Sequence, residues 1–149
     1  MSSAQAMTVD SRYRHDPRWP AVEAALDALR ERHRCAVRIV DTDCGAGGFL
    51  IAVAEQARAM GFTAIEGRGL GGSPALIGRA RAAAWRHRHA AMGLVFERGD
   101  PIAALAEERD FPADILVCHR CDTQKDALRA AAACVIGDPC DEYEQEMAA

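Results

Sequence analysis

Apolar side chains recur along the chain with two different periods, one typical of helices and one of strands. From Pro20 to about His33 they recur every three or four positions, which predicts a first helix. Short β-branched runs and amphipathic stretches then alternate. The pattern predicts strands over residues 37–41, 62–66, 94–97 and 113–118, and helices over 49–60, 75–90, 102–109 and 126–135.

This alternation predicts the fold class. Each connection between strands is too long for a hairpin and contains a helix, which is typical of parallel strands with right-handed crossovers. We therefore expect an α/β, doubly wound sheet with helices on both faces. The polar residues 1–16 are expected to form a mobile N-terminal tail, and residues 17–149 a single domain. The glycines of residues 67–72 predict a loop or an irregular strand end.

No fifth strand can be recognised after the last predicted helix. Gly137, Asp138 and Pro139 follow, and then an acidic segment containing Asp141, Glu142, Glu144 and Glu146. A four-stranded sheet that ends there has an exposed edge, which a partner chain or the acidic segment must cover. We therefore expect a homodimer.

Composition excludes several classes of protein. The net charge of −4 and the pI of about 5.7 argue against a general nucleic-acid binder. No apolar run approaches the ~20 residues of a membrane span, and the N-terminus lacks the apolar centre of a signal peptide. A cytoplasmic protein whose six cysteines are reduced is the resulting expectation.

The turn after the first predicted strand is the strongest candidate for a ligand site. That strand ends at Asp41 and runs through Gly45 and Gly47 into a helix. Small residues let the backbone approach a ligand there, and the helix start offers free N–H groups. A dinucleotide fingerprint requires a third glycine where this chain has Leu50, so a pyrophosphate is disfavoured.

Four segments, in order, resemble class I S-adenosylmethionine-dependent methyltransferases. Residues 39–47 (IVDTDCGAG) are similar to the family's first motif, an acidic residue followed by spaced glycines. Residues 69–77 (GLGGSPALI) resemble the end of its second strand and the following helix. Residues 96–101 (FERGDP) and 111–118 (FPADILVC) resemble the ends of its third and fourth strands. The resemblance covers roughly residues 37–135, and it implies a Rossmann-like methyltransferase fold that is truncated at its C-terminal end.

The resemblance implies S-adenosylmethionine as the cofactor and assigns positions to it. Asp41, Gly45 and Gly47, with the backbone of Cys44, would lie under its methionine part. Asp100 would accept a hydrogen bond from the adenine amino group. The alternative for Asp100 is a turn residue that follows Gly99.

Two positions depart from the family pattern. Asp43 stands where the family has its first glycine. Gly71 stands where the family has the acid that binds both ribose hydroxyls, and the nearest acid is Glu66. The ribose acid usually lies about 20 residues after the first strand, which favours Glu66, whereas the Ser73-Pro74 pair favours Gly71. Both remain candidates for the ribose position.

Residues near the fourth strand supply the remaining candidates. His119 is the candidate general base. Adjacent first and fourth strands would bring Cys44 and Cys118 to one edge of the sheet, which makes Cys118 a cofactor-site candidate and predicts a lowered thiol pKa near a helix start. Cys118 and Cys121 have C-x-x-C spacing, and Cys134 with Cys140 would complete four zinc ligands, but the pattern is unusual for zinc and no metal is predicted.

Three functions remain open at this point. The first is methyl transfer from S-adenosylmethionine to an acceptor that no residue identifies. The second is a non-catalytic relative, a binding or partner module with a weakened cofactor site. The third is a zinc- or redox-responsive domain around Cys118 and Cys121. The basic run of residues 79–89 is interpreted as a solvated helix face.

Overall fold

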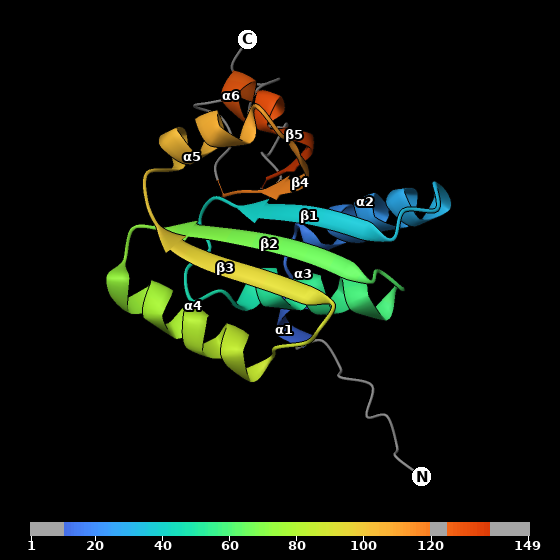
Figure 1. The fold of residues 1–149 in the computed structure, drawn as a ribbon, viewed down its shortest axis with the longest axis horizontal. Helices are drawn as coiled ribbons and strands as arrows, with labels where there is room; N and C mark the ends of the chain where they lie inside the picture. The colour runs from blue at the N-terminus through green and yellow to red at the C-terminus, as the bar shows by residue number, and fades with distance from the viewer. Residues whose placement is uncertain (1–10, 120–124, 138–149) are drawn as a thin grey trace, which may run out of the picture.

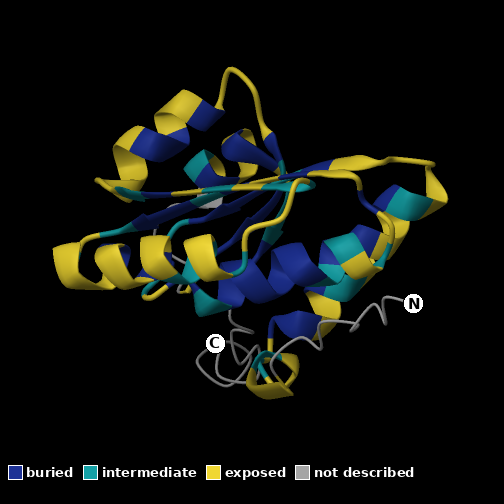
Figure 2. Ribbon diagram, turned by 60° about the horizontal axis from the view of Figure 1, so that its bottom comes forward, coloured by how far each residue is buried: buried dark blue, intermediate teal, exposed yellow. Residues whose placement is uncertain are grey.

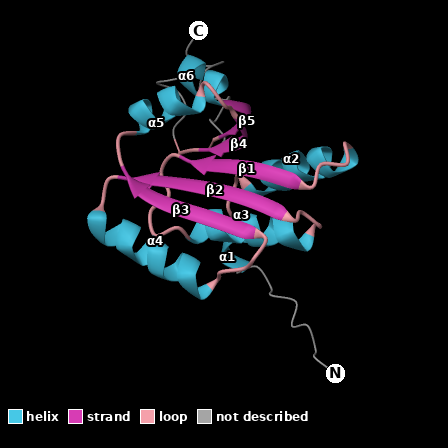
Figure 3. Ribbon diagram, in the orientation of Figure 1, coloured by secondary structure: helices cyan, strands magenta, loops and turns pink. Residues whose placement is uncertain are grey.

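Parallel strands form one twisted sheet in the order β3-β2-β1-β4-β5, as the computed structural model shows (Figure 1, Figure 3). The structure describes residues 11–119 and 125–137. All four strand pairs are parallel, which confirms the predicted α/β, doubly wound class. The strands are β1 (Ala36–Asp41), β2 (Ala64–Gly71), β3 (Met92–Arg98), β4 (Ala113–Val117) and β5 (Ala132–Ile136).

Helices cover both faces of the sheet, and each face has its own apolar core. One core joins the helices before β3 to the sheet, and the other joins the helices after β3. Strand interiors are buried while the outer sides of the helices are exposed (Figure 2). In the described part of the chain, no helix has the length and apolar character to cross a membrane. The helices are α1 (Ser11–Arg14), α2 (Trp19–Glu31), α3 (Gly48–Ala59), α4 (Pro74–Arg86), α5 (Pro101–Glu108) and α6 (Lys125–Ala131).

The glycines of β2 belong to the strand, so of the two alternatives predicted for residues 67–72 the strand end is confirmed up to Gly71 and the loop is wrong there. Gly67 and Gly69 lie under large side chains of β3. A Cβ on Gly67 would lie 2.5 Å from Leu94 Cδ2, and one on Gly69 would lie 2.5 Å from Phe96 Cδ1. The glycines therefore make room for packing inside the sheet layer.

A fifth strand is present, so the prediction of a four-stranded sheet is wrong. The helix predicted to reach Val135 ends at Ala131, and β5 pairs with β4 directly afterwards. Four consecutive alanines, residues 130–133, span the junction and give no turn signal. Because β4 is covered by β5, the exposed β4 edge that suggested a homodimer does not exist.

The segment before the first long helix also differs from the prediction. Residues 11–16 were assigned to a mobile tail, but Ser11–Arg14 form α1, which contacts α3. The Tyr13 ring meets the Phe49 ring edge-on, with centroids 6.3 Å apart. Residues 1–10 lie outside the described part of the chain.

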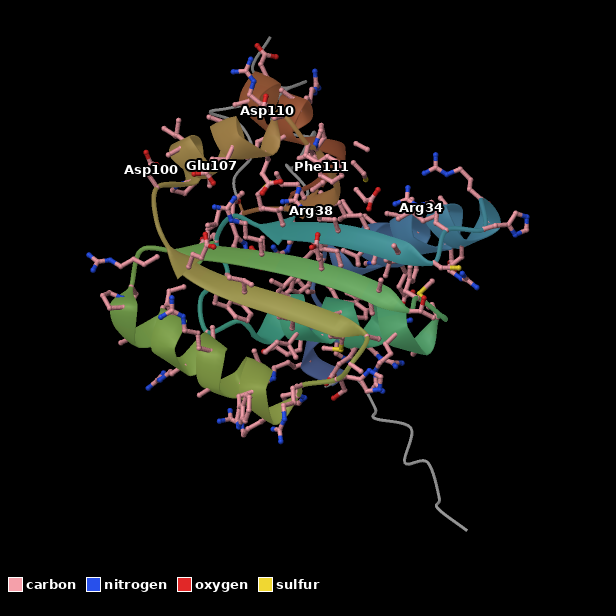
Figure 4. All side chains as sticks on the ribbon, viewed as in Figure 1. Arg34, Arg38, Asp100, Glu107, Asp110 and Phe111 are labelled. Atoms are coloured by element: carbon pink, nitrogen blue, oxygen red, sulfur yellow. The ribbon has the colours of Figure 1, made fainter. Side chains whose placement is uncertain are left out.

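Ion pairs attach α5 to the open face of the sheet. Glu108, which is 2 % exposed, accepts hydrogen bonds from both Arg38 on β1 and Arg68 on β2. Arg68 also pairs with Glu97 at 2.9 Å and with Glu107 at 2.8 Å. Figure 4 shows Arg38 directed towards α5 and Phe111. A buried carboxylate shared by two guanidinium groups thus fixes the short helix over β1 and β2.

We expect Gly69→Ala to lower the free energy of unfolding by about 1–3 kcal/mol, because the new methyl group overlaps the Phe96 ring. Urea unfolding followed by circular dichroism measures this change. Gly72→Ala is the matched control, since a Cβ there has no heavy atom within 4 Å, and its effect should stay within about 0.5 kcal/mol. Equal stability of the two variants would contradict the packing described here.

Candidate functional site

The turn between β1 and α3 forms the floor of the candidate site. Gly45 and Gly47 have φ angles of 52° and 82°, in the left-handed region that favours glycine. The Cys44 N–H donates to the Leu70 carbonyl at 2.9 Å, which ties the turn to the end of β2. A Cβ on Gly47 would lie 2.9 Å from Ala80 and Phe96, whereas one on Gly45 would meet nothing within 4 Å. The backbone at Gly45 is therefore open to a ligand.

Asp41 places a buried carboxyl group at the base of this turn. The side chain is among the most buried in the protein and accepts a hydrogen bond from the Asp43 N–H at 3.1 Å. Burial raises the pKa of Asp41 to about 6, against the opposing effects of the Asp43 hydrogen bond and of the nearby Arg18 and His119 charges. Such a carboxylate gains stability from any cation that binds beside it.

A hollow of about 390 Å³ opens above Asp41 at the carboxyl ends of β1 and β4. This volume falls within the range of small-molecule pockets. Four predicted residues line it together: Asp41, Cys44, Gly45 and His119. It lies where open α/β sheets bind ligands, because β2 and β4 lie on opposite sides of β1 and the strand order reverses there.

Residues from the N-terminal segment complete the hollow, and no motif or spacing in the sequence predicts their presence there. These residues are Tyr13, Asp16 and Arg18, and they line the hollow together with Asp43 of the turn and Phe49 of α3. Arg18 is 3 % exposed, binds both oxygens of Asp16 at 3.0 Å, and lies 4.0 Å from the centroid of the Phe49 ring. In the sequence, Asp16 and Arg18 are part of a polar stretch with no periodicity. Only the Trp19–Pro20 helix start close by marks this segment as structured.

The two candidates for the ribose position, Glu66 and Gly71, lie at different points along β2. Glu66 is in the first half of the strand, and its exposed side chain pairs with Arg38 at 3.4 Å on the face that carries α5. Gly71 is the last residue of the strand, and Ser73 caps α4 by accepting from the Leu76 N–H at 3.3 Å. Gly71 is therefore the candidate that lies at the carboxyl end of β2. Glu66 does not approach the hollow.

Asp100 lies at the same edge of the sheet but outside the hollow. It is the N-cap of α5, and its Oδ1 accepts a hydrogen bond from the Ile102 N–H at 3.1 Å. Figure 4 shows it at the start of α5, beyond the end of β3. Asp100 therefore has a structural role as a helix cap, in line with the alternative of a turn residue. Its carboxylate is also exposed and accessible to a ligand.

The cysteines differ from expectation in two respects. Burial, reinforced by the neighbouring Asp41 charge, raises the pKa of Cys44 to about 11, so a lowered pKa is wrong for this thiol. Cys118 is buried and disulfide-bonded, so the expectation that every cysteine is reduced is wrong for Cys118. Cys121 and Cys140 lie outside the described residues. Among the described ones, no group of three His, Cys, Asp or Glu side chains could hold a metal ion.

Comparison with known proteins identifies the fold. No family model and no curated protein sequence matches the chain. A solved candidate class I S-adenosylmethionine-dependent methyltransferase from Listeria monocytogenes matches with a TM-score of 0.57 at 17% identity, over 80% of this chain and 33% of that one. A candidate caffeoyl-CoA O-methyltransferase from Staphylococcus aureus matches with a TM-score of 0.54 at 12% identity, over 80% of this chain and 56% of that one.

A third solved structure is a candidate protein-L-isoaspartate O-methyltransferase from Plasmodium falciparum, in complex with S-adenosyl-L-homocysteine. It matches with a TM-score of 0.52 at 13% identity, over 76% of this chain and 55% of that one. The chain thus spans about a third to just over half of the length of these three structures. With its parallel sheet and crossover helices, the chain has the Rossmann-like fold of class I S-adenosylmethionine-dependent methyltransferases.

Proposed function

We propose that the protein binds S-adenosylmethionine at the carboxyl edge of β1 and β2 and transfers its methyl group to an acceptor at the end of β4. The observation that carries this proposal is the β1–α3 turn, in which the open backbone of Gly45 and the buried Asp41 face one hollow. The likeness in fold to methyltransferases supports the same function.

The amino-acid part of the cofactor fits the floor of the hollow. The Asp41 carboxyl group is buried and its pKa is raised, so an ammonium group beside it would stabilise the ionised form. Gly45 leaves room for the ligand above the turn. The first N–H groups of α3 favour a carboxylate close by. We assign the methionine part to Asp41, Gly45 and Gly47, with the Cys44 backbone.

The nucleoside part of the cofactor has fewer matching side chains in the proposed site. Gly71 stands where the fold family has its ribose acid, and no other carboxylate takes its place within the described end of β2. Losing a charge-assisted pair of hydrogen bonds costs roughly 1.5–3 kcal/mol of binding free energy. The exposed Asp100 is the acceptor that we assign to the adenine amino group.

His119 is the residue we assign to proton transfer. It follows β4, lines the hollow, and is close enough to Asp16 and Asp41 to lower the pKa of both. Bound S-adenosylmethionine supplies an electrophilic methyl group. The chain's part is to hold an acceptor lone pair in line with that group and to take the acceptor's proton on the imidazole.

A non-catalytic binding module is the second candidate function, and Gly71 favours it. A Cβ at Gly71 would lie 3.2 Å from Ile77 Cδ1 and 3.7 Å from Cys44 Sγ, so neighbouring side chains already occupy part of the space for an acid. Cofactor binding without transfer to any offered acceptor would support this candidate over the enzyme.

Restoring the missing acid tests the proposed site. We expect calorimetric titration to detect binding of S-adenosylmethionine and S-adenosylhomocysteine, and Gly71→Asp to tighten it about tenfold or more, because the new carboxylate pairs with the ribose hydroxyls. The matched control is Gly72→Asp, which adds the same charge one residue later, at a position with open space. Absence of binding at millimolar ligand, or an equal effect of the two variants, would overturn the proposed site.

The raised pKa of Asp41 predicts how binding depends on pH. Below about pH 6 this carboxyl group is mainly protonated and attracts an ammonium group weakly, so affinity for S-adenosylhomocysteine should rise about tenfold from pH 5 to pH 7. Asp41→Asn should bind weakly at both pH values. The exposed Asp27→Asn in α2 should keep the wild-type dependence. A pH-independent wild-type affinity would contradict the role given to Asp41.

A further inference from the structure

A groove of about 320 Å³ lies between α4 and the edge strand β3, and it shares no residue with the hollow above Asp41. Side chains of α4 form one wall and β3 forms the other. Figure 1 shows α4 running below β3 at the outer side of the sheet, and Figure 2 shows most of that helix exposed. The main side chains that line the groove are Arg81, Trp85, Arg88, Met92, Leu94 and Phe96.

The groove is positively charged although the chain as a whole is negative. The sequence contains no Asp or Glu from Gly67 to Phe96, while α4 and the turn after it carry Arg79, Arg81, Arg86 and Arg88. None of these four arginines forms an ion pair with a described residue. By contrast, Arg34 before β1, Arg38 on β1 and Arg68 on β2 all pair with carboxylates. The guanidinium groups of α4 are therefore available to an anionic partner.

Two of these arginines and a tryptophan are held in place over the groove. Arg88 lies 4.2 Å from the centroid of the Trp85 ring and donates to the Trp85 carbonyl at 2.9 Å. Trp85 is 68 % exposed. Arg81 Nε donates to the Phe96 carbonyl at 2.9 Å, which fixes its guanidinium against the outer edge of β3. Tryptophan and arginine are the residues that most often anchor protein interfaces.

The backbone of β3 also faces the groove. In a parallel strand, alternate residues direct their N–H and C=O groups to the same neighbour. Ile65 donates to the Ala91 carbonyl and Gly99 donates to the Gly71 carbonyl, so odd-numbered residues of this segment pair with β2. Even-numbered residues such as Leu94 and Phe96 therefore direct their backbone groups outward. Two of these outward groups are already bonded, because the Phe96 carbonyl accepts from Arg81 and the Met92 N–H donates to the His89 carbonyl. Because β3 is the edge of the sheet, an extended peptide can pair with the remaining ones, which are the Met92 carbonyl, both groups of Leu94 and the Phe96 N–H.

We propose that this groove docks an acidic peptide in extended conformation, which adds as a strand to the outer edge of β3. Side chains of an added strand point alternately to the two faces of the sheet. Carboxylates at every second position therefore meet Arg81 and Arg88 on the α4 side, while the intervening side chains face the other way. A peptide is favoured over a nucleic acid because the outward backbone groups of β3 form hydrogen bonds with the backbone of another polypeptide.

The test uses the full chain and a labelled peptide of about eight residues in which glutamate and valine alternate. Fluorescence anisotropy should detect binding that weakens about tenfold or more in the double variant Arg81→Gln/Arg88→Gln. The matched control is Arg32→Gln/Arg109→Gln, which removes two exposed arginines outside the groove and should leave the affinity unchanged. Thermal unfolding of both variants checks that the fold is retained.

Two modified peptides and one oligonucleotide distinguish this proposal from uncharged-peptide and nucleic-acid binding. A peptide with glutamine in place of glutamate, and one with proline at its centre, should each lose binding, because the first lacks charge and the second cannot pair with β3. Equal binding of either peptide would overturn the proposal. It would also be overturned if an oligothymidylate bound more tightly than the acidic peptide and lost affinity in the Arg81→Gln/Arg88→Gln variant.

Discussion

Close packing of the Phe96 ring against Gly47 and Gly69 fixes how β3, β2 and the β1–α3 turn fit together. The ring lies 2.9 Å from where a Cβ of Gly47 would be, and 2.5 Å from where a Cβ of Gly69 would be. One aromatic side chain thus joins β3, β2 and the β1–α3 turn, and it requires glycine at both positions. The same row of glycines continues to Gly71. The close packing that shapes the turn therefore extends to Gly71 at the end of β2, where a Cβ would lie 3.2 Å from Ile77 Cδ1.

The sequence predicts the parts of the fold that depend on periodicity and turn chemistry. The strand ending at Asp41 and the helices after Gly47 and Ser73 lie close to their predicted places, because β-branched runs and caps act locally. The prediction failed at β5, where alanines hide the junction. At β2 the glycines left a loop and a strand end as alternatives, because the sequence does not show that the Phe96 ring packs on Gly69.

Some residues of the candidate site could be predicted from the sequence, and others could not. Asp41, Cys44 and Gly45 meet in one hollow because they share a single turn, and His119 joins them because β4 pairs with β1. The register of β2 separates Glu66 from the site, and only strand pairing could show this. Asp16 and Arg18 enter through contacts with α3 that no spacing rule predicts. In the structure they form an ion pair whose guanidinium group stacks on Phe49. In the sequence they are only two residues of an ordinary polar stretch.

Because of Asp41, ligand binding in the hollow and the free energy of unfolding are coupled. Its pKa is raised from 3.8 to about 6 in the folded chain, so ionising it at neutral pH opposes folding. A cationic ligand bound beside it would remove that opposition and would raise the free energy of unfolding. A substitution at this position therefore has opposing effects on stability and on ligand binding. Replacing the acid with a neutral residue would stabilise the empty fold and, under the proposed function, would weaken ligand binding.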